Sequence, residues 1–400
     1  MIWGYDWGKG EQMLRTVIAP IQAGCLTLTL RREEWPLEAC VTYATRQNPR
    51  RLYLFVSKVL GKHWPVRPQI MHQVHQQLAA KIAHLPGPLL VVGMAETATA
   101  LGRGVAEEAV AQTGRADLLY LQTTRCRLSR PLAFAFDEAH SHAPDHAVYL
   151  PEPALQPLFQ AARSLVLVDD EISTGRTLLE LAKAYLRRNP WVEQVALVSI
   201  TCWLSEARRQ ELSLRLERQV TFPALIEGEF CFKADPGFPS PVLPQALAGV
   251  DICHDAIVAD PARTGVMAGH WMKPLRLWEK VSQSVRGVDR PLTVIGAGEY
   301  TYAPFRIALA LEEVGYDVRY QSTTRSPMLV GDAIVSRREF PDHQDCGIPN
   351  YLYNLDPQRL PLVIYEHPTL LATHPLSGEI GGLAFAVEEN HAVHCDLSGS

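Results

Sequence analysis

The strongest constraint on the fold is an internal repeat. Four segments of the first half return in the same order in the second half, and the separation between matching segments shrinks steadily along the chain. One match could arise by chance, but four in order indicate two copies of one domain, the second with shorter loops. The matched segments are 61–68 with 268–274, 88–96 with 291–299, 122–125 with 322–325, and 144–146 with 341–343.

Within each copy, strand patterns alternate with helix patterns. Apolar residues from Ile70 to Ile82 recur at helical spacing, and 89–92 is a short continuous apolar run typical of a buried parallel strand. This alternation predicts an α/β fold of two related doubly wound domains with parallel sheets. In the first copy the expected helices are 68–82, 98–111 and 177–187, and the expected strands are 89–92, 118–121 and 165–168.

The chain of 400 residues divides into four expected parts. A short β-hairpin is predicted around 23–25, before the first copy. Proline and glycine crowd residues 222–244, most densely at 236–241, which is typical of a connection. The expected parts are an N-terminal hairpin region at 1–40, a first domain at 41–220, a linker at 221–250 and a second copy at 251–400.

Composition excludes several classes of protein. Hydrophobic residues make up 47% and charged residues 20%, which excludes a disordered chain. The formal net charge of −5 argues against nucleic acid as a partner. No apolar run suits a membrane span, no signal peptide is visible, and the eight cysteines are widely spaced. We therefore expect a cytoplasmic protein with reduced thiols and no membrane partner, with a homodimer as one possible assembly.

The clearest chemical motif is the turn that follows the strand at 165–168. Paired carboxylates come first, and a hydroxyl-rich turn around a glycine then opens an amphipathic helix. Hydroxyls and backbone N–H groups at a helix N-terminus bind phosphate, and two carboxylates suit ribose hydroxyls and Mg²⁺. An ordinary helix cap is the alternative, but a cap needs one such residue. The candidate residues are Asp169, Asp170, Glu171, Ser173, Thr174, Gly175, Arg176 and Thr177.

This turn resembles the motif that binds phosphoribosyl pyrophosphate (PRPP) in type I phosphoribosyltransferases. The resemblance implies that Asp169 and Asp170 are catalytic, bind the ribose diol and hold Mg²⁺ as cofactor, and that residues 173–177 bind the 5-phosphate. It further implies Mg-dependent transfer of ribose 5-phosphate from PRPP to a nitrogenous base-like acceptor, with release of pyrophosphate.

Two more segments match parts of the same family. Residues 93–100 resemble its pyrophosphate-binding loop, and residues 123–130, which contain three arginines, stand where the family has a mobile catalytic loop. Arginines there could neutralise the departing pyrophosphate. The alternatives are an ordinary turn and a solvated basic loop. The candidate pyrophosphate-binding residues are Met94, Ala95, Glu96, Thr97 and Lys62, and Arg125 is a candidate catalytic residue.

The whole layout resembles a two-part branch encoded in bacterial tellurite-resistance gene clusters. Its second domain is named for a Thr-Arg-Ser-Pro motif, which reads Thr324–Pro327 here. That branch implies a role in making a nucleoside-like metabolite and leaves the acceptor open. Because residues 364–367 retain a single acid and no phosphate turn, we expect the second copy not to bind PRPP in the usual way. It could cap the first copy, bind the other substrate or keep inherited folding features.

Residues 137–146 hold three histidines and three carboxylates. They could form a divalent-metal site, a polar loop, or an acid/base group near the acceptor in the form of His140 or His142, of which His142 is the catalytic candidate. Some members of the family have a carboxylate where Ser173 stands, so a proton acceptor would have to come from elsewhere.

Two rival functions remain. A non-catalytic PRPP or nucleotide sensor, with the second copy as effector module, is the main alternative. A tandem pyrophosphokinase is weaker, because no recognisable ATP-binding motif accompanies the repeat.

Overall fold

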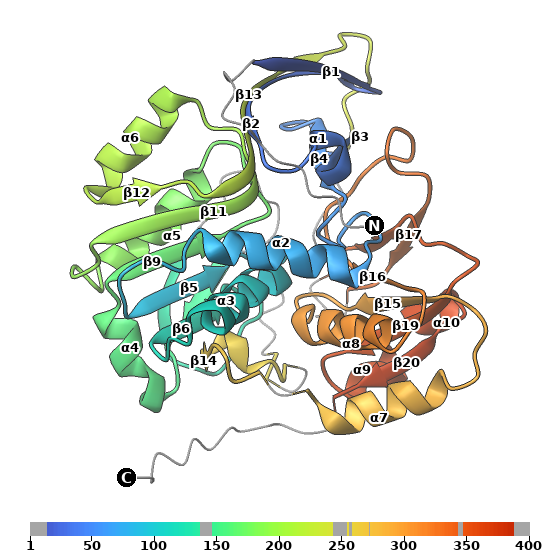
Figure 1. The fold of residues 1–400 in the computed structure, drawn as a ribbon. Coiled ribbons are helices and arrows are strands. Elements are labelled where there is room, and N and C mark those ends of the chain that lie inside the picture. Colours follow the sequence, from blue (N-terminus) through green and yellow to red (C-terminus); the bar gives the residue numbers. More distant parts are fainter. Residues whose placement is uncertain are drawn as a thin grey trace.

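Both copies expected from the repeat are present as α/β units in the computed structural model of the chain, and they lie side by side (Figure 1). The structure describes residues 14–136, 146–242, 254–255, 258–271, 273–342 and 347–387. The predicted fold class, two related doubly wound domains with parallel sheets and an N-terminal hairpin, is confirmed. Within these ranges, no helix is long and apolar enough to cross a membrane.

The first sheet has a parallel core whose strands are buried on both faces, as their continuous apolar sequences require. In spatial order the core strands are β13 (Ala224–Ala234), β11 (Gln194–Cys202), β9 (Ser164–Val168), β5 (Leu89–Gly93) and β6 (Leu118–Gln122). Antiparallel additions are the hairpin of β1 (Arg15–Ile21) and β2 (Gly24–Glu33) on β13, and β14 (Val266–Met267) on β6. The short strands β10 (Glu171–Ile172) and β12 (Gln219–Thr221) pair with β11.

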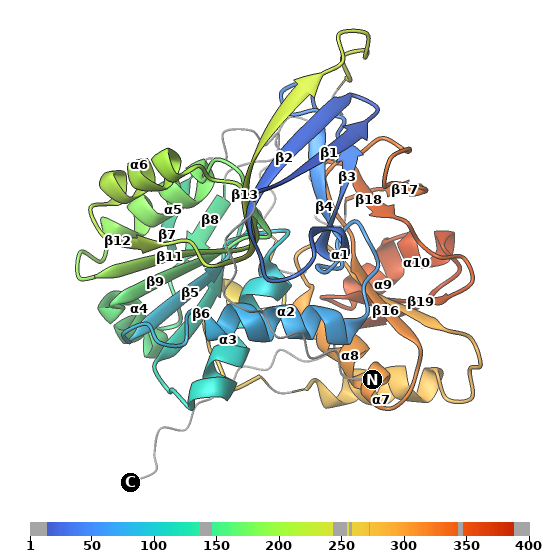
Figure 2. The same cartoon turned by 45° about the horizontal axis from the view of Figure 1, so that its top comes forward.

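Helices cover both faces of this sheet (Figures 1 and 2). On one face lie α2 (Pro68–Ala80) and α3 (Thr99–Thr113), and on the other α4 (Gln156–Ala161), α5 (Arg176–Leu186) and α6 (Glu206–Leu216). The remaining elements are α1 (Leu37–Cys40), the pair β3 (Val41–Thr45) and β4 (Tyr53–Ser57), the pair β7 (Leu132–Phe136) and β8 (His146–Tyr149), and the 3-10 turns η1 (Pro153–Leu155) and η2 (Pro261–Arg263).

The second sheet repeats the strand order of the first. Its four parallel strands are β16 (Val318–Ser322), β15 (Leu292–Gly296), β19 (Leu360–Tyr365) and β20 (Leu383–Ala386), matching β6, β5, β9 and β11. The antiparallel pair β17 (Arg337–Phe340) and β18 (Asn350–Tyr353) matches β7 and β8. The helices are α7 (Leu275–Ser284), α8 (Tyr302–Glu313), α9 (Thr369–Thr373) and α10 (Leu376–Glu379).

The strand β13 lies inside the range expected as a linker. It extends the first sheet and carries the N-terminal hairpin, so the hairpin and the first copy share one sheet. The stretch 222–244 that suggested a connection therefore contains a strand of the first sheet, and its densest proline and glycine part, 236–241, follows the end of this strand at Ala234.

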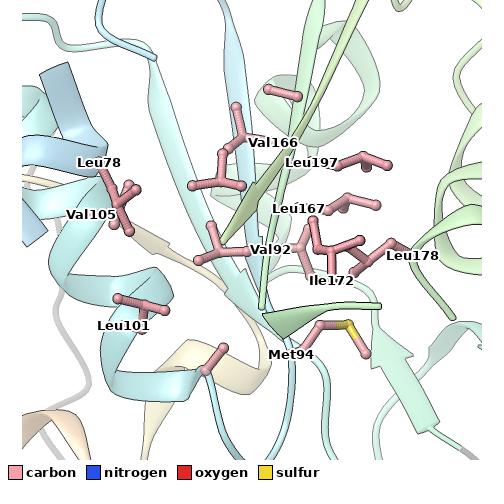
Figure 3. Close-up of a cluster of buried hydrophobic side chains, with 14 of the residues drawn as sticks. Leu78, Val92, Met94, Leu101, Val105, Val166, Leu167, Ile172, Leu178 and Leu197 are labelled. Atoms are coloured by element: carbon pink, nitrogen blue, oxygen red, sulfur yellow. The ribbon is translucent and has the colours of Figure 1, made fainter. Parts of the chain in front are cut away.

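Aliphatic side chains support the ends of β5 and β9 (Figure 3). Val92, Val166 and Leu167 are at most 3% exposed and pack with Leu101 of α3 and Leu178 of α5. Burial of each such side chain contributes about 1.5–3 kcal/mol. The polar loops at these strand ends therefore stand on a rigid apolar base.

The two copies pack through equivalent contacts, as two subunits of a symmetric dimer would. Thr99 at the start of α3 and Thr301 just before α8 share a hydrogen bond of 2.6 Å between their hydroxyls. Val66, before α2, pairs with Tyr320 of β16, and Val266, before α7, pairs with Tyr120 of β6. Each copy thus adds a short segment to the edge strand of the other, and the domains form one continuous body.

Candidate functional site

A cavity of about 220 Å³ lies at the carboxyl ends of β5 and β9, between the two copies. Ligands of open α/β sheets bind at this position. The turn after β9, the loop after β5, the chain around β3 and β4, and the second copy all contribute to its lining.

The two carboxylates expected to bind ribose lie together in this cavity. Asp169 and Asp170 directly follow β9, are half-buried and both line the cavity. The backbone N–H of Asp170 donates to Oδ1 of Asp169 over 2.9 Å, and the Thr97 hydroxyl donates to the same oxygen over 3.4 Å. The acidic turn and the loop after β5 therefore meet, as the sequence predicts for parallel strands.

The expected phosphate turn lies between β10 and α5. Gly175 has φ +66°, and a Cβ there would stand 2.8 Å from Cδ1 of buried Leu212, so this position favours glycine. The Thr174 carbonyl accepts a hydrogen bond of 2.9 Å from Nε of Arg208. Thr177 lines the cavity, whereas residues 173–176 are not among its lining residues: Thr174 and Arg176 are exposed and Ser173 is half-buried. The turn is therefore open to a ligand that enters the cavity.

Glu171 is tied to the N-terminal part of the chain. Its carboxylate receives a hydrogen bond of 2.7 Å from Arg51, whose guanidinium lies 4.9 Å from the centre of the Tyr53 ring. Burial raises the pKa of Glu171, although Arg51 opposes this shift. Both residues line the cavity, so the chain before β4 closes its side next to the acidic turn.

All four candidate pyrophosphate residues of the loop after β5, Met94 to Thr97, line the cavity. The N–H of Ala95 donates to the Thr123 hydroxyl over 2.8 Å. Glu96 accepts a hydrogen bond of 2.9 Å from the N–H of Arg325, and its carboxylate lies 3.4 Å from Nζ of Lys62. Burial alone would raise the pKa of Glu96, but Lys62 and Arg325 lower it to about 2. Glu96 is thus an ionised contact between the copies.

Lys62, the fifth candidate, lies behind this loop. It is 2% exposed, does not contribute to the lining of the cavity, and pairs with Glu96. Burial lowers its pKa. In this structure its charge therefore acts on the loop rather than directly on the cavity.

Arg125 lines the cavity, but its main chain contacts the second copy. Its N–H donates to Glu299 over 2.8 Å, and the Thr124 hydroxyl donates to the same carboxylate over 2.6 Å. Arg325 and Thr324 form the mirrored arrangement around Glu96. The repeated Thr-Thr-Arg motif thus binds each copy to the acidic residue of the other.

The catalytic candidate His142 and its neighbour His140 lie outside the described residues. His146 is described: it is buried, lines the cavity, and its Nδ1 lies 3.2 Å from the Thr123 hydroxyl. The described ranges contain no group of three or more His, Cys, Asp or Glu side chains that could hold a metal ion. A metal site within residues 137–145 stays a prediction.

Sequence reasoning missed the residues that the second copy and the N-terminal part bring to the cavity. His63 is one: burial and nearby Lys62 lower its pKa to about 3, so its imidazole is neutral at pH 7. The repeated Thr-Thr-Arg motif was a usable signal, because it indicates that Arg125 and Arg325 occupy equivalent positions in the two copies. These additional lining residues are Arg46, Asn48, Arg51, Leu54, His63, Thr324, Arg325, Ser326, Pro327, Ile348, Pro349 and Tyr351.

The equivalent position of the second copy is filled by Arg263 of η2. Its guanidinium contacts both carboxylate oxygens of Glu366, at 2.6 and 3.1 Å, and Oε2 of Glu299 at 3.1 Å. Glu366 follows β19 as Asp170 follows β9, and Glu299 corresponds to Glu96. Arg263 is 1% exposed. An internal guanidinium therefore occupies the place that remains open in the first copy.

Comparison with known families agrees with this geometry. Residues 40–229 match a family model described as phosphoribosyl transferase. Residues 260–374 match the TRSP domain, which is described as lying C-terminal to that transferase domain. The chain therefore contains a region similar to the phosphoribosyl transferase family, followed by a region similar to the TRSP domain, in the order that the description of the TRSP domain gives.

Solved phosphoribosyltransferases resemble about half of the chain at low identity. The APRTase from Giardia lamblia complexed with 9-deazaadenine is 15% identical, with 49% of this chain and 97% of that chain covered and a TM-score of 0.35. The orotate phosphoribosyltransferase of Mycobacterium tuberculosis H37Rv is 10% identical, with 48% and 91% covered and a TM-score of 0.29. A search of curated proteins found no match.

Proposed function

We propose that the chain is a Mg²⁺-dependent phosphoribosyltransferase. It transfers ribose 5-phosphate from PRPP to a nitrogenous base-like acceptor and releases pyrophosphate. The observation that carries this proposal is that the two carboxylates after β9, Thr177 of the phosphate turn and the loop after β5 all line the same cavity.

In this proposal, different residues around the cavity bind different parts of PRPP. The 5-phosphate lies on the Ser173–Thr177 turn at the start of α5, where backbone N–H groups and hydroxyls favour an anion. The ribose diol lies on Asp169 and Asp170. The pyrophosphate lies against the loop after β5, with Arg125 nearby to offset its charge.

The donor set suits Mg²⁺. Asp169 and Asp170 present carboxylate oxygens to one cavity, and Mg²⁺ is bound by one or two carboxylates together with substrate phosphates. When bound, the ion would neutralise phosphate charge. These two residues would hold it, and the remaining residues of the chain orient the sugar and the leaving group.

The wider setting is part of the proposal. A cytoplasmic role in making a nucleoside-like metabolite, in bacteria with tellurite-resistance gene clusters, fits a chain whose residues 260–374 match the TRSP domain. The proposed partners are PRPP and one small acceptor, with no nucleic acid and no membrane. A homodimer is the proposed assembly, and sedimentation velocity tests it by measuring the mass of the protein in solution.

Pyrophosphate release from Mg·PRPP over a panel of nitrogen heterocycles tests the activity. We expect release with at least one acceptor from the wild-type chain and none from Asp169→Asn. The exposed acid Asp289, changed to Asn, is the matched control and should leave release unchanged.

Binding without turnover is the second candidate. Glu96 favours it, because an ionised carboxylate stands in the loop that would receive pyrophosphate. A sensor would bind Mg·PRPP yet release no pyrophosphate with any acceptor, so the same panel, combined with calorimetry, separates the two functions.

A further inference from the structure

We infer that Arg325 of the second copy binds the pyrophosphate end of PRPP in the site of the first copy. This inference rests on the proposed function and gives the TRSP motif a direct part in it. Arg325 lines the cavity together with the loop after β5 and with Asp169 and Asp170.

The loop itself supplies no cation. Residues 93–97 contain one charged side chain, the carboxylate of Glu96, and Lys62 lies buried behind it. A pyrophosphate group carries several negative charges, so the positive charge that balances it has to come from outside the loop. Arg325 is joined directly to the loop through its N–H, which donates to Glu96 over 2.9 Å.

The segment that carries Arg325 is held in a fixed conformation. The Tyr353 hydroxyl accepts a hydrogen bond of 2.9 Å from the N–H of Met328 and donates one of 2.8 Å to the Ser326 carbonyl. Gln47 of the first copy donates from its N–H to the Pro327 carbonyl over 2.9 Å. A binding group that is already ordered loses less conformational entropy when its ligand arrives.

The same construction recurs in the first copy, which shows that it belongs to the repeated domain. The Tyr149 hydroxyl contacts the N–H of Leu128 at 2.8 Å and the Cys126 carbonyl at 3.1 Å. There the mirrored arginine, Arg125, is joined to Glu299, beside the position that Arg263 fills. The exchange at Glu96 therefore borders the cavity, whereas the exchange at Glu299 borders a position that the Arg263 guanidinium fills.

The charge of Arg325 is partly balanced by Asp342. One terminal nitrogen lies 3.2 Å from both carboxylate oxygens of this residue, which is buried. This pair distinguishes two roles. If Arg325 only maintains the fold, removing either partner should have a similar effect. If it binds pyrophosphate, removing Asp342 should leave anion binding intact.

Calorimetry with three probes tests the inference on the full chain: Mg·pyrophosphate, Mg·PRPP and ribose 5-phosphate. Arg325→Gln should weaken the first two by about tenfold or more, the usual loss for a charge-assisted contact, and change ribose 5-phosphate by less than about twofold. Asp342→Asn should bind Mg·pyrophosphate at least as tightly as the wild type. Arg338→Gln, at an exposed arginine of β17, is the control and should change nothing.

Unchanged binding of Mg·pyrophosphate by Arg325→Gln would overturn the inference, and so would an equal loss for ribose 5-phosphate. If Arg325→Gln does not fold, Arg325→Lys is the deciding variant. It should lower the affinity for Mg·pyrophosphate, because lysine cannot reproduce the planar, bidentate guanidinium. Asp342→Asn should not lower this affinity. Failure of the proposed function has a different signature, in which the wild-type chain binds neither Mg·PRPP nor ribose 5-phosphate.

Discussion

The two copies place different groups at the same position of the same fold. In the first, Asp170 faces a cavity, and Nζ of Lys62 lies 3.4 Å from the carboxylate of Glu96. In the second, Glu366 is buried against Arg263, which also reaches Glu299. The acidic position is therefore open to a cavity in the first copy, whereas the Arg263 guanidinium fills it in the second copy. Among the described residues, the two copies thus differ in whether this position is open or filled.

Removing the internal cation should have the largest effect on stability. Arg263→Met would leave the carboxylates of Glu299 and Glu366 buried without the guanidinium that pairs with both, at a cost of about 3–5 kcal/mol in the free energy of unfolding. Urea denaturation measures this loss. Arg338→Met, at an exposed site, should stay within about 0.5 kcal/mol. A loss below about 1 kcal/mol for Arg263→Met would mean that the second position is not closed by this charge pair.

The acid that joins the first copy to the second should make stability depend on pH. The pKa of Glu96 is lowered to about 2, so its contribution is complete above its unfolded value near 4.5 and is lost as pH falls towards 2. Near pH 7 we expect the free energy of unfolding of the wild type to exceed that of Glu96→Gln by about 3 kcal/mol at most. Denaturation curves from pH 7 to pH 3 should show this difference shrinking below pH 4.5. A constant difference would contradict the assigned ionisation.

Two glycines with similar backbone angles should respond differently to alanine. Gly175 and Gly114 have φ of +66° and +69°, but a Cβ at Gly175 meets Leu212, whereas Gly114 has open space. We expect a loss of about 1 kcal/mol for Gly114→Ala and about 2 kcal/mol for Gly175→Ala. Gly175→Ala alone should also weaken ribose 5-phosphate in calorimetry. Equal effects on binding would remove the phosphate turn from the site.

The contact between the copies offers the smallest effect. The Thr99 and Thr301 hydroxyls lie 2.6 Å apart in a buried contact, so Thr→Val at either position removes one partner. A double-mutant cycle in urea denaturation should give a coupling energy of about 1 kcal/mol. Additive losses would mean that this hydrogen bond does not join the copies.

Much of this architecture could be predicted from the sequence. The apolar runs at 89–92 and 165–168 locate strands, and the acidic turn after the second run lies on the cavity as expected. These features are local or depend on the shared edge of a parallel sheet. The repeated Thr-Thr-Arg motif shows that Arg125 and Arg325 occupy equivalent positions. It does not show which copy each loop contacts, so the exchange of these arginines between the copies could not be predicted.

Lys62 shows the same limit. The second copy has Gly269 in place of this lysine, which suggested a phosphate contact particular to the first copy, yet in the structure Lys62 lies behind Glu96. Arg263 gave no motif at all, since its partners, Glu299 and Glu366, are remote in sequence. Such buried charge pairs become visible only when the sheets and their interface are known.

Titration of the full chain with Mg·PRPP in a calorimeter tests the central claim most directly. The open corner of the first copy and the closed one of the second predict one PRPP bound per chain, with Asp170→Asn weakening it by about tenfold or more and Asp289→Asn leaving it unchanged. Two PRPP per chain, no binding at all, or full affinity in Asp170→Asn would contradict the account.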